Sequence, residues 1–269
     1  MSAARGRRIG RRDLLVLGGA AIGWPRWAAA QTAGKVGVVF MHGKWAPGIK
    51  PLGNLQRQLG QAGYLTVMPM MPWSAGANYD RSYLDAMTGI DASVSTLRSQ
   101  GAGRIVVGGQ SLGANAAIGY GARRPGLMAI VAISPGHEPE LSTDSEVRDC
   151  VARAKAMVAS GRGNNSDAFI DMNQGEKRTI RTTAAIYLSY WDPAGPAIMP
   201  ANAARLSAPL LWVVGTEDRM YARGTAYAFD KAPPDPLSRF LPVAGTHRTV
   251  VQSVGPQVVE WLNRVRDAK

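Results

Sequence analysis

The chain has 269 residues, 46% of them apolar, and its 31 Lys and Arg against 19 Asp and Glu give a formal net charge of +12. This amount of apolar surface excludes a disordered chain, and a single cysteine, Cys150, excludes a disulfide framework. With three histidines in all, the sequence also disfavours a structural zinc site. A charge of +12 is compatible with a nucleic-acid or membrane partner, so the positions of the charges must decide.

The first thirty residues carry +5 of that charge, from six arginines and one aspartate. Their arginine-rich start is followed by an apolar stretch, Leu14 to Trp24, and then by Ala28-Ala29-Ala30. This order is typical of a secretory signal peptide, and the apolar stretch is shorter than the roughly 20 residues of a membrane-spanning helix. Arg11-Arg12 with the following Asp13-Leu14-Leu15 resembles the twin-arginine export motif, with a general secretory signal or an uncleaved anchor as the alternatives. We therefore expect residues 1–30 to direct export, and residues 31–269 to form a periplasmic or secreted protein.

The expected mature chain keeps 239 residues with 25 Lys and Arg and 18 Asp and Glu, a net charge of +7. It contains no run of basic residues and no stripe of Lys and Arg alternating with aromatic residues. Nucleic-acid binding therefore loses its support, and a membrane is expected to be a partner only through the signal segment during export. Cys150 is expected to be a packing residue rather than a nucleophile.

Short apolar runs rich in Val and Ile, each bounded by turn residues, predict strands along the mature chain. In chain order the predicted strands are Val36–Phe40, Tyr64–Met70, Ile105–Gly109, Ile130–Ser134, Leu210–Gly215 and Arg239–Val243. Between them, apolar residues at helical spacing predict helices: Leu52, Leu55, Leu59 and Ala62 in one, and Tyr83, Met87, Ile90, Val94 and Leu97 in another. Strands that alternate with helices predict an α/β fold with a mostly parallel central sheet covered by helices on both faces.

Residues 136–206 interrupt this alternation. The stretch holds a helical segment around Val147–Val158, the sequence Gly161-Arg162-Gly163-Asn164-Asn165, and Trp191-Asp192-Pro193. It is too long for a simple connection between neighbouring strands. We expect a cap or lid inserted over the strand ends, with a peripheral excursion as the alternative.

The predicted strand Ile105–Gly109 runs into Gly109-Gln110-Ser111-Leu112-Gly113, a G-x-S-x-G sequence, and a helix is predicted from Asn115 onward. A sharp strand-to-helix turn strains the serine and crowds its neighbours, which glycines at positions −2 and +2 relieve. The serine Oγ is then presented above the sheet at the positive end of a helix. A phosphate-binding loop is excluded, because no Lys-Ser/Thr follows Gly113 and no G-x-G-x-x-G spacing exists.

A serine needs a base to become a nucleophile, and the ends of two later strands supply the residue types. Asp218 follows Leu210–Gly215, and His247 follows Arg239–Val243. The order Ser111, Asp218, His247 matches the order of serine, acid and histidine in α/β-hydrolases. On these residues, the mature chain resembles the α/β-hydrolase superfamily across most of its length.

The resemblance implies that His247 takes the proton of Ser111 and that Asp218 fixes the histidine tautomer and stabilises the imidazolium. Glu217 is the adjacent alternative acid, and Asp192 is a more distant one. His137 follows another strand end, in Ser134-Pro135-Gly136-His137, and is a candidate for the pocket lining or for an alternative base.

After the first predicted strand comes Met41-His42-Gly43-Lys44-Trp45. In the α/β-hydrolase superfamily, His-Gly at this point introduces the loop that supplies one oxyanion-hole N–H. The resemblance places that donor at Lys44, with Trp45 as the alternative, and places its partner at the N–H of Leu112. His42 is then a residue that stabilises the loop rather than a base.

Three tryptophans, Trp45, Trp73 and Trp191, are expected either to wall an apolar acyl or alcohol pocket or to pack in the core and cap. No metal or organic cofactor is implied. We expect an exported serine hydrolase that cleaves a small-molecule ester or related acyl bond through an acyl-enzyme. The alternatives are a catalytically silent binding protein of the cell envelope and an acyltransferase that uses the same three residues.

Overall fold

The computed structural model describes residues 1 and 34–268; residues 2–30 of the predicted export signal lie outside this described part. A six-stranded parallel sheet runs in the order β2-β1-β3-β4-β7-β8. Its strands are β1 (Lys35–Met41), β2 (Leu65–Val67), β3 (Ala102–Ser111), β4 (Ala129–Pro135), β7 (Leu210–Gly215) and β8 (Arg239–Val243). The predicted α/β fold with a mostly parallel central sheet is therefore confirmed.

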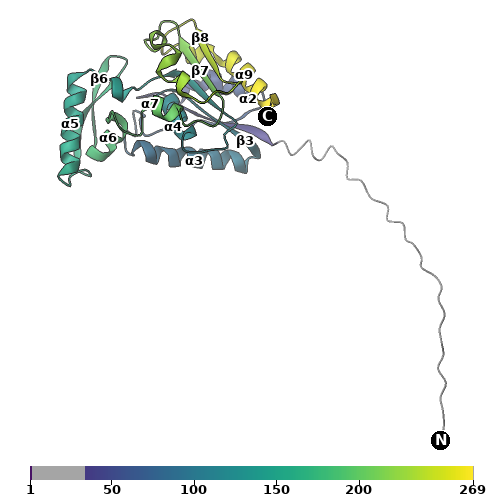
Figure 1. The fold of residues 1–269 in the computed structure, drawn as a ribbon, viewed down its shortest axis with the longest axis horizontal. Helices are drawn as coiled ribbons and strands as arrows, with labels where there is room; N and C mark the ends of the chain where they lie inside the picture. The colour runs from purple at the N-terminus through teal and green to yellow at the C-terminus, as the bar shows by residue number, and fades with distance from the viewer. Residues whose placement is uncertain (2–33, 269) are drawn as a thin grey trace. The chain divides into compact units, whose positions relative to one another are not determined.

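Helices cover both faces of this sheet (Figure 1). One face packs against α3 (Tyr83–Ser99) and α4 (Leu112–Gly121), and the other against α2 (Gly53–Gln61), α8 (Val250–Ser253) and α9 (Gly255–Ala268). Successive strand residues alternate between the two cores, because side chains along a strand point to opposite faces. This double burial is why the central strands β1, β3, β4 and β7 are largely apolar runs in the sequence.

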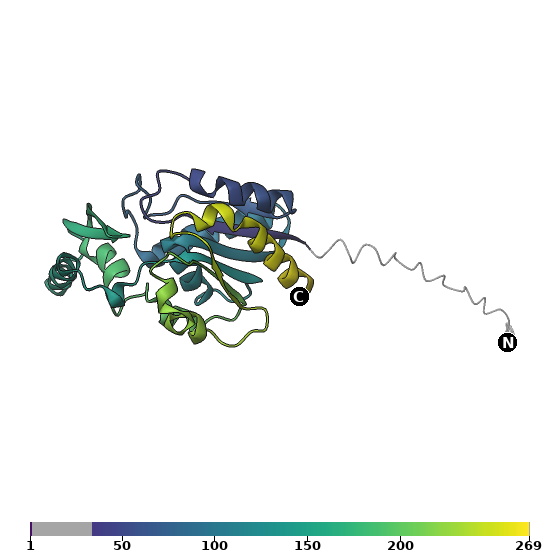
Figure 2. The same cartoon turned by 90° about the horizontal axis from the view of Figure 1, so that it is seen from above.

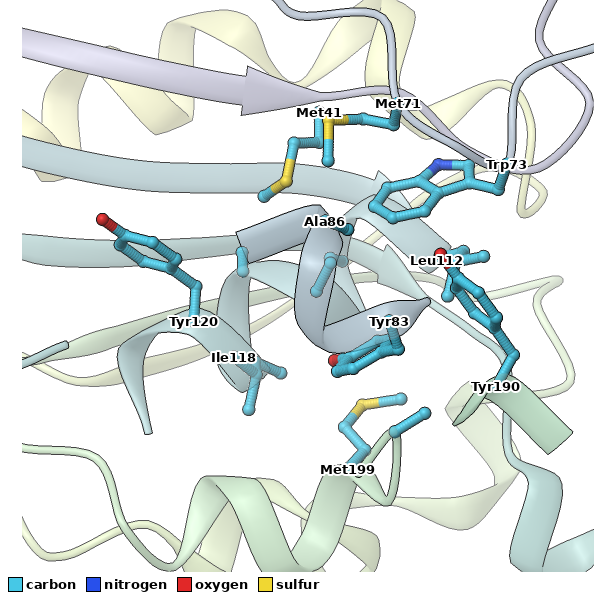
Figure 3. Close-up of a cluster of buried hydrophobic side chains, with 14 of the residues drawn as sticks. Met41, Met71, Trp73, Tyr83, Ala86, Leu112, Ile118, Tyr120, Tyr190 and Met199 are labelled. Atoms are coloured by element: carbon cyan, nitrogen blue, oxygen red, sulfur yellow. The ribbon is translucent and has the colours of Figure 1, made fainter. Parts of the chain in front are cut away.

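The core on the α3–α4 face extends to Leu112, the residue that follows Ser111. Figure 3 shows Leu112, Trp73, Tyr83 and Tyr190 among its buried side chains. The Tyr83 hydroxyl donates to Asn115 Oδ1 at 2.7 Å, so the single polar group of this ring is paired inside the core. The start of α4 is thereby held against α3.

The strand predicted at Tyr64–Met70 is shorter in the structure, where β2 spans Leu65–Val67. The prediction was wrong at its C-terminal end. Pro69 and Pro72 follow the strand, and a proline has no N–H to donate to a neighbouring strand. Met70, with 53% of its surface exposed, lies outside the core that the apolar run suggested.

Residues 136–209, between β4 and β7, form an insertion with its own small sheet. Its elements are η2 (Pro139–Leu141), α5 (Ser145–Ala159), β5 (Ser166–Asn173), β6 (Glu176–Thr183), α6 (Ala184–Trp191) and α7 (Met199–Ala203). The helix expected around Val147–Val158 corresponds to α5, and the buried Cys150 packs there. In both views most of the insertion lies beyond the carboxyl ends of the strands (Figure 1, Figure 2).

The antiparallel hairpin β5–β6 was not predicted from the sequence. Its turn is Gln174-Gly175, with φ of 52° and 84°, and such positive values are typical of a two-residue hairpin turn. Phe169 and Asp171 of β5 are both buried on the same face of the hairpin. A buried aspartate on that face needs hydrogen-bond donors, and residues of the candidate active site provide them.

Short helical turns complete the fold: η1 (Lys50–Leu52), η3 (Tyr221–Arg223), η4 (Thr225–Tyr227) and η5 (Phe229–Lys231). Within residues 34–268, no helix has both the length and the apolar character to cross a bilayer.

Candidate active site

Ser111 occupies the turn between β3 and α4 with φ 58° and ψ −121°. A positive φ is unfavourable for a residue with a Cβ, and such strain persists only where the surroundings impose it. Ser111 is the last residue of β3 and the N-cap of α4, so its side chain stands at the carboxyl edge of the sheet. Its surface is 5% exposed.

Two glycines make this turn possible. A Cβ on Gly109 would lie 2.2 Å from the carbonyl carbon of Gly113, and a Cβ on Gly113 would lie 2.5 Å from the Met41 carbonyl oxygen. Both distances are far below van der Waals contact with backbone atoms, which cannot move aside. The G-x-S-x-G spacing is therefore a steric requirement of the strand-to-helix turn in this chain.

The structure brings Ser111, His247 and Asp218 together from three strand ends. His247 Nε2 lies 2.9 Å from Ser111 Oγ, and His247 Nδ1 lies 2.7 Å from Asp218 Oδ2. Since a carboxylate only accepts, Nδ1–H donates to Asp218, and Nε2 is left to accept from the serine hydroxyl. The other Asp218 oxygen accepts the N–H of Met220 at 3.0 Å, which fixes the carboxylate in place.

The other acid and base candidates lie elsewhere. Glu217 is exposed, and Asp192 pairs with Lys155 at 2.9 Å. His137 Nε2 lies 2.8 Å from the Tyr190 carbonyl oxygen, to which it donates. Burial, assisted by the nearby Lys44 charge, holds the pKa of His137 well below its ordinary value, so its ring is neutral near pH 7.

His42 holds together the loop after β1. Its Nδ1–H donates to the Gly43 carbonyl at 2.8 Å, its Nε2 accepts the Met71 N–H at 3.0 Å, and its carbonyl accepts the Trp73 indole N–H at 2.8 Å. Burial lowers the pKa of His42, which keeps the ring neutral. These bonds connect the loop to the segment after β2, as expected of a loop-stabilising residue.

Lys44 and Trp45 turn their side chains toward the insertion. Lys44 Nζ donates to Asp171 Oδ1 at 2.6 Å and to the Met172 carbonyl at 2.9 Å, and it lies 4.3 Å from the Trp191 ring centroid. The indole N–H of Trp45 donates to Asp171 Oδ2 at 2.7 Å. Burial lowers the pKa of Lys44, and the Asp171 charge opposes this shift.

Asp171 is fully buried and also accepts the Tyr79 hydroxyl at 2.7 Å and the Trp191 indole N–H at 3.1 Å. Its donors therefore come from the loop after β1, the segment after β2, and α6. Sequence reasoning missed Asp171. The signal was present, because in Phe169-Ile170-Asp171 the aspartate lies two residues from a large apolar residue, on the same face of a strand.

The backbone N–H groups near Ser111 differ in their availability. The Trp45 N–H donates to the Trp73 carbonyl at 2.9 Å, whereas the Lys44 N–H has no acceptor within residues 34–268. Leu112 is the first residue of α4, so its N–H has no acceptor inside the helix. Within the described part of the chain, the N–H groups of Lys44 and Leu112 are thus both without a backbone acceptor.

Two cavities meet at Ser111, and both are also bordered by Lys44 and Asn173. We call the one of about 150 Å³, which extends under the insertion, the insertion-side cavity; His137 and Trp191 line it. The other, of about 380 Å³, is the histidine-side cavity, because His247 lines it together with Trp45.

Trp73 differs from the expectation of a pocket wall. It is fully buried, lies in the core beneath the loop after β1, and lines neither of these two cavities.

Comparison with known proteins gives a structural match only. No family model matches the chain, and no curated protein matches it in sequence. A solved structure of metagenome-derived lipolytic enzymes is 15% identical with a TM-score of 0.62, covering 87% of this chain and 95% of that one. The monoacylglycerol lipase of Paleococcus ferrophilus is 21% identical with a TM-score of 0.61, covering 85% and 94%.

A third similar structure is described as an α/β-hydrolase enzyme from a lagoon-sediment metagenome. It is 15% identical with a TM-score of 0.56, covering 87% of this chain and 92% of that one. At such identities the likeness concerns the course of the backbone. The chain has the α/β-hydrolase fold.

Proposed function

We propose that this protein is a serine hydrolase that cleaves an ester or related acyl bond through an acyl-enzyme. The observation that carries the proposal is the continuous hydrogen-bonded series Ser111–His247–Asp218 at the carboxyl edge of the sheet. Each member has the bond that its role requires, and Ser111 borders two cavities large enough to admit substrate atoms.

In the first half-reaction, Ser111 Oγ attacks the carbonyl carbon of the substrate while its proton passes to His247 Nε2. The carbonyl oxygen becomes an oxyanion. When the tetrahedral intermediate collapses, the bond to the leaving alcohol breaks and His247 returns the proton to that alcohol. Asp218 keeps Nδ1 protonated throughout and stabilises the positive imidazolium.

For the oxyanion we assign the N–H groups of Lys44 and Leu112 as donors. The Trp45 alternative is disfavoured, because its N–H already donates to the Trp73 carbonyl. One such donor is commonly worth about 3–4 kcal/mol in the transition state. The Leu112 donor also benefits from its position at the N-terminus of α4, where the helix dipole favours negative charge.

In the second half-reaction, a water molecule replaces the alcohol. His247 Nε2 takes one proton from the water while the water oxygen attacks the acyl carbon. The bond between that carbon and Ser111 Oγ then breaks. His247 then returns the proton to Ser111, which releases the carboxylic acid and restores the starting state. No further reactant is needed to balance either half-reaction.

Similar folds among lipases and esterases support an ester as the bond cleaved, since several of the matched structures carry those names. The proposed partner is a small-molecule ester. We also propose that residues 1–30 direct export, which predicts a periplasmic mature form that begins near Gln31. Loss of that form on Arg11→Lys with Arg12→Lys would support the twin-arginine route, and its persistence would refute it.

The experiment that tests the hydrolase combines a fluorophosphonate probe with p-nitrophenyl esters of graded acyl length. Wild-type protein is expected to be labelled and to hydrolyse at least one ester, and Ser111→Ala is expected to lose both properties. Absence of labelling and hydrolysis in the folded wild type would favour a binding protein. Labelling that survives Ser111→Ala would refute the choice of nucleophile, and ester exchange with an added alcohol in preference to hydrolysis would identify an acyltransferase.

A further inference from the structure

His247 lines one of the two cavities at Ser111 and not the other. This difference indicates which half of the substrate each cavity binds. In the proposed function, on which this inference rests, His247 Nε2 returns a proton to the leaving alcohol. The alcohol must then lie within hydrogen-bond reach of His247, which lines the histidine-side cavity but not the insertion-side cavity. The acyl group, on the other side of the carbonyl carbon, extends into the insertion-side cavity.

The insertion-side cavity suits a short acyl group. Its volume of about 150 Å³ is below the 300–1,000 Å³ of typical ligand pockets. Its lining is mainly polar, with apolar contributions only from Leu141, Met172 and Trp191. A long hydrocarbon chain would find little apolar surface to cover there.

Two arginines in the lining provide more donors than the protein uses. Nη2 of Arg219 donates to both Glu138 oxygens, at 3.2 and 3.1 Å, and Arg223 lies 3.6 Å from the same carboxylate. Each guanidinium carries five N–H donors, so most of them remain available to a ligand. Glu140, which is not in the lining, accepts the Tyr227 hydroxyl at 2.6 Å instead of a guanidinium.

Glu138 holds the Arg219 guanidinium at the cavity wall. Its side chain is 3% exposed and the Arg219 side chain is 49% exposed, so the cation is the more accessible member of the pair. The other buried charges, Lys44 and Asp171, neutralise one another. The charged groups of the lining thus sum to one surplus positive charge when the Lys44–Asp171 pair is set aside.

Two buried polar atoms of the same lining also have no partner within the described part of the chain: His137 Nδ1 and Ser142 Oγ. The His137 residue is 7% exposed, and because Nε2–H donates to Tyr190, Nδ1 is an acceptor. Buried polar atoms are normally paired, and of these two the Ser142 hydroxyl can donate to an anionic ligand, whereas His137 Nδ1 can only accept.

We infer that the insertion-side cavity binds a short acyl group whose far end carries a carboxylate, received by Arg219 and Arg223. The substrate class is then the half-ester of a short dicarboxylic acid. A carboxylate matches the forked geometry of a guanidinium, and its charge offsets the surplus positive charge of the lining.

The test compares three ethyl esters with a four-carbon acyl group: monoethyl succinate, ethyl 3-hydroxybutyrate and ethyl butyrate. Hydrolysis is followed by titrating the released acid at constant pH. We expect kcat/KM for monoethyl succinate to exceed that for ethyl butyrate by about 10-fold to 100-fold, as for a charged hydrogen bond. A preference for either uncharged ester would overturn the inference.

Arg219→Gln and Arg223→Gln are each expected to lower the succinate-to-butyrate ratio of kcat/KM about tenfold or more. Arg248→Gln is the matched control, since Arg248 lines the histidine-side cavity and pairs with Glu176 at 2.8 Å. An unchanged ratio in both test variants would refute the assigned receptor.

The failure of this inference differs from the failure of the proposed function. Fluorophosphonate labelling of Ser111 with ethyl butyrate as the better substrate removes only the carboxylate preference. Absence of labelling and of hydrolysis of all three esters removes the hydrolase and the inference together.

Discussion

Asp171 offers the most demanding test of the structure, because a residue of the insertion holds the loop that carries the proposed oxyanion donor. In Asp171→Asn, the amide oxygen can occupy the place of Oδ2 and keep the bonds from Trp45 and Tyr79. The amide NH₂ then takes the place of Oδ1, against Lys44 Nζ and the Trp191 indole N–H. The substitution therefore leaves a buried ammonium facing other donors.

The expected loss of stability follows from this geometry. The Lys44 and Asp171 side chains are 3% and 0% exposed, and breaking one side of such a buried pair commonly costs about 3–5 kcal/mol. Against a typical unfolding free energy of about 5–15 kcal/mol, the protein is weakened but can still fold. A second variant, Lys44→Met with Asp171→Asn, removes the buried charge as well, and we expect it to regain about 2 kcal/mol or more.

The expected catalytic effect is separate. If the loop shifts by an ångström, the Lys44 N–H no longer points at the oxyanion, and kcat should fall on the order of 10²-fold with little change in KM. Urea unfolding measures the stability of both variants, and ester kinetics well below the melting temperature measure kcat and KM. Asp171→Asn with wild-type stability and kcat would refute the reasoning, and so would a double variant that is less stable than Asp171→Asn alone.

The remaining predictions concern the proposed catalytic residues and the core. Asp218→Asn is expected to lower kcat by roughly 10³-fold to 10⁴-fold while fluorophosphonate labelling becomes slow rather than absent, which stopped-flow labelling measures. Gly113→Ala places a Cβ 2.5 Å from the Met41 carbonyl oxygen, so thermal denaturation should show a loss of about 2 kcal/mol or more, whereas the unobstructed Gly89→Ala in α3 should stabilise by about 0.5–1 kcal/mol. Burial depresses the pKa of His137, so the unfolded chain takes up its proton first as pH falls below 6.5, and stability declines by up to about 1.4 kcal/mol per pH unit from this group. His137→Gln should make that decline shallower in urea unfolding between pH 5 and 7.5, and an unchanged slope would contradict the assignment.

Strands buried on both faces were the most predictable part of the fold. The central strand β7 has the predicted bounds, Leu210–Gly215, because a short run of Leu, Trp and Val between turn residues has few other uses in a parallel sheet. The edge strand β8 also has its predicted bounds, Arg239–Val243, although it is only partly buried. The edge strand β2 was overestimated, because hydropathy alone does not register that Pro69 lacks an N–H.

The three proposed catalytic residues were predictable for a different reason. Ser111, Asp218 and His247 each follow a predictable strand, so a prediction of the sheet also places them at one edge. The hairpin β5–β6 was not predicted, since β6 is mostly exposed and polar and so resembles a loop in sequence. The side chain of Lys44 likewise finds its partner 127 positions away, a distance over which sequence pattern carries no information.

The hydrogen bonds to Asp171 make the insertion and the loop after β1 depend on one another structurally. An insertion without a carboxylate at this position would leave Lys44 and Trp45 without their acceptor. Conversely, this insertion joined to another sheet would bury the Asp171 carboxylate without the Lys44 ammonium that neutralises it. Exchange of the insertion by recombination, or by design, must therefore carry residues 42–45 with it, although more than ninety positions separate the two segments.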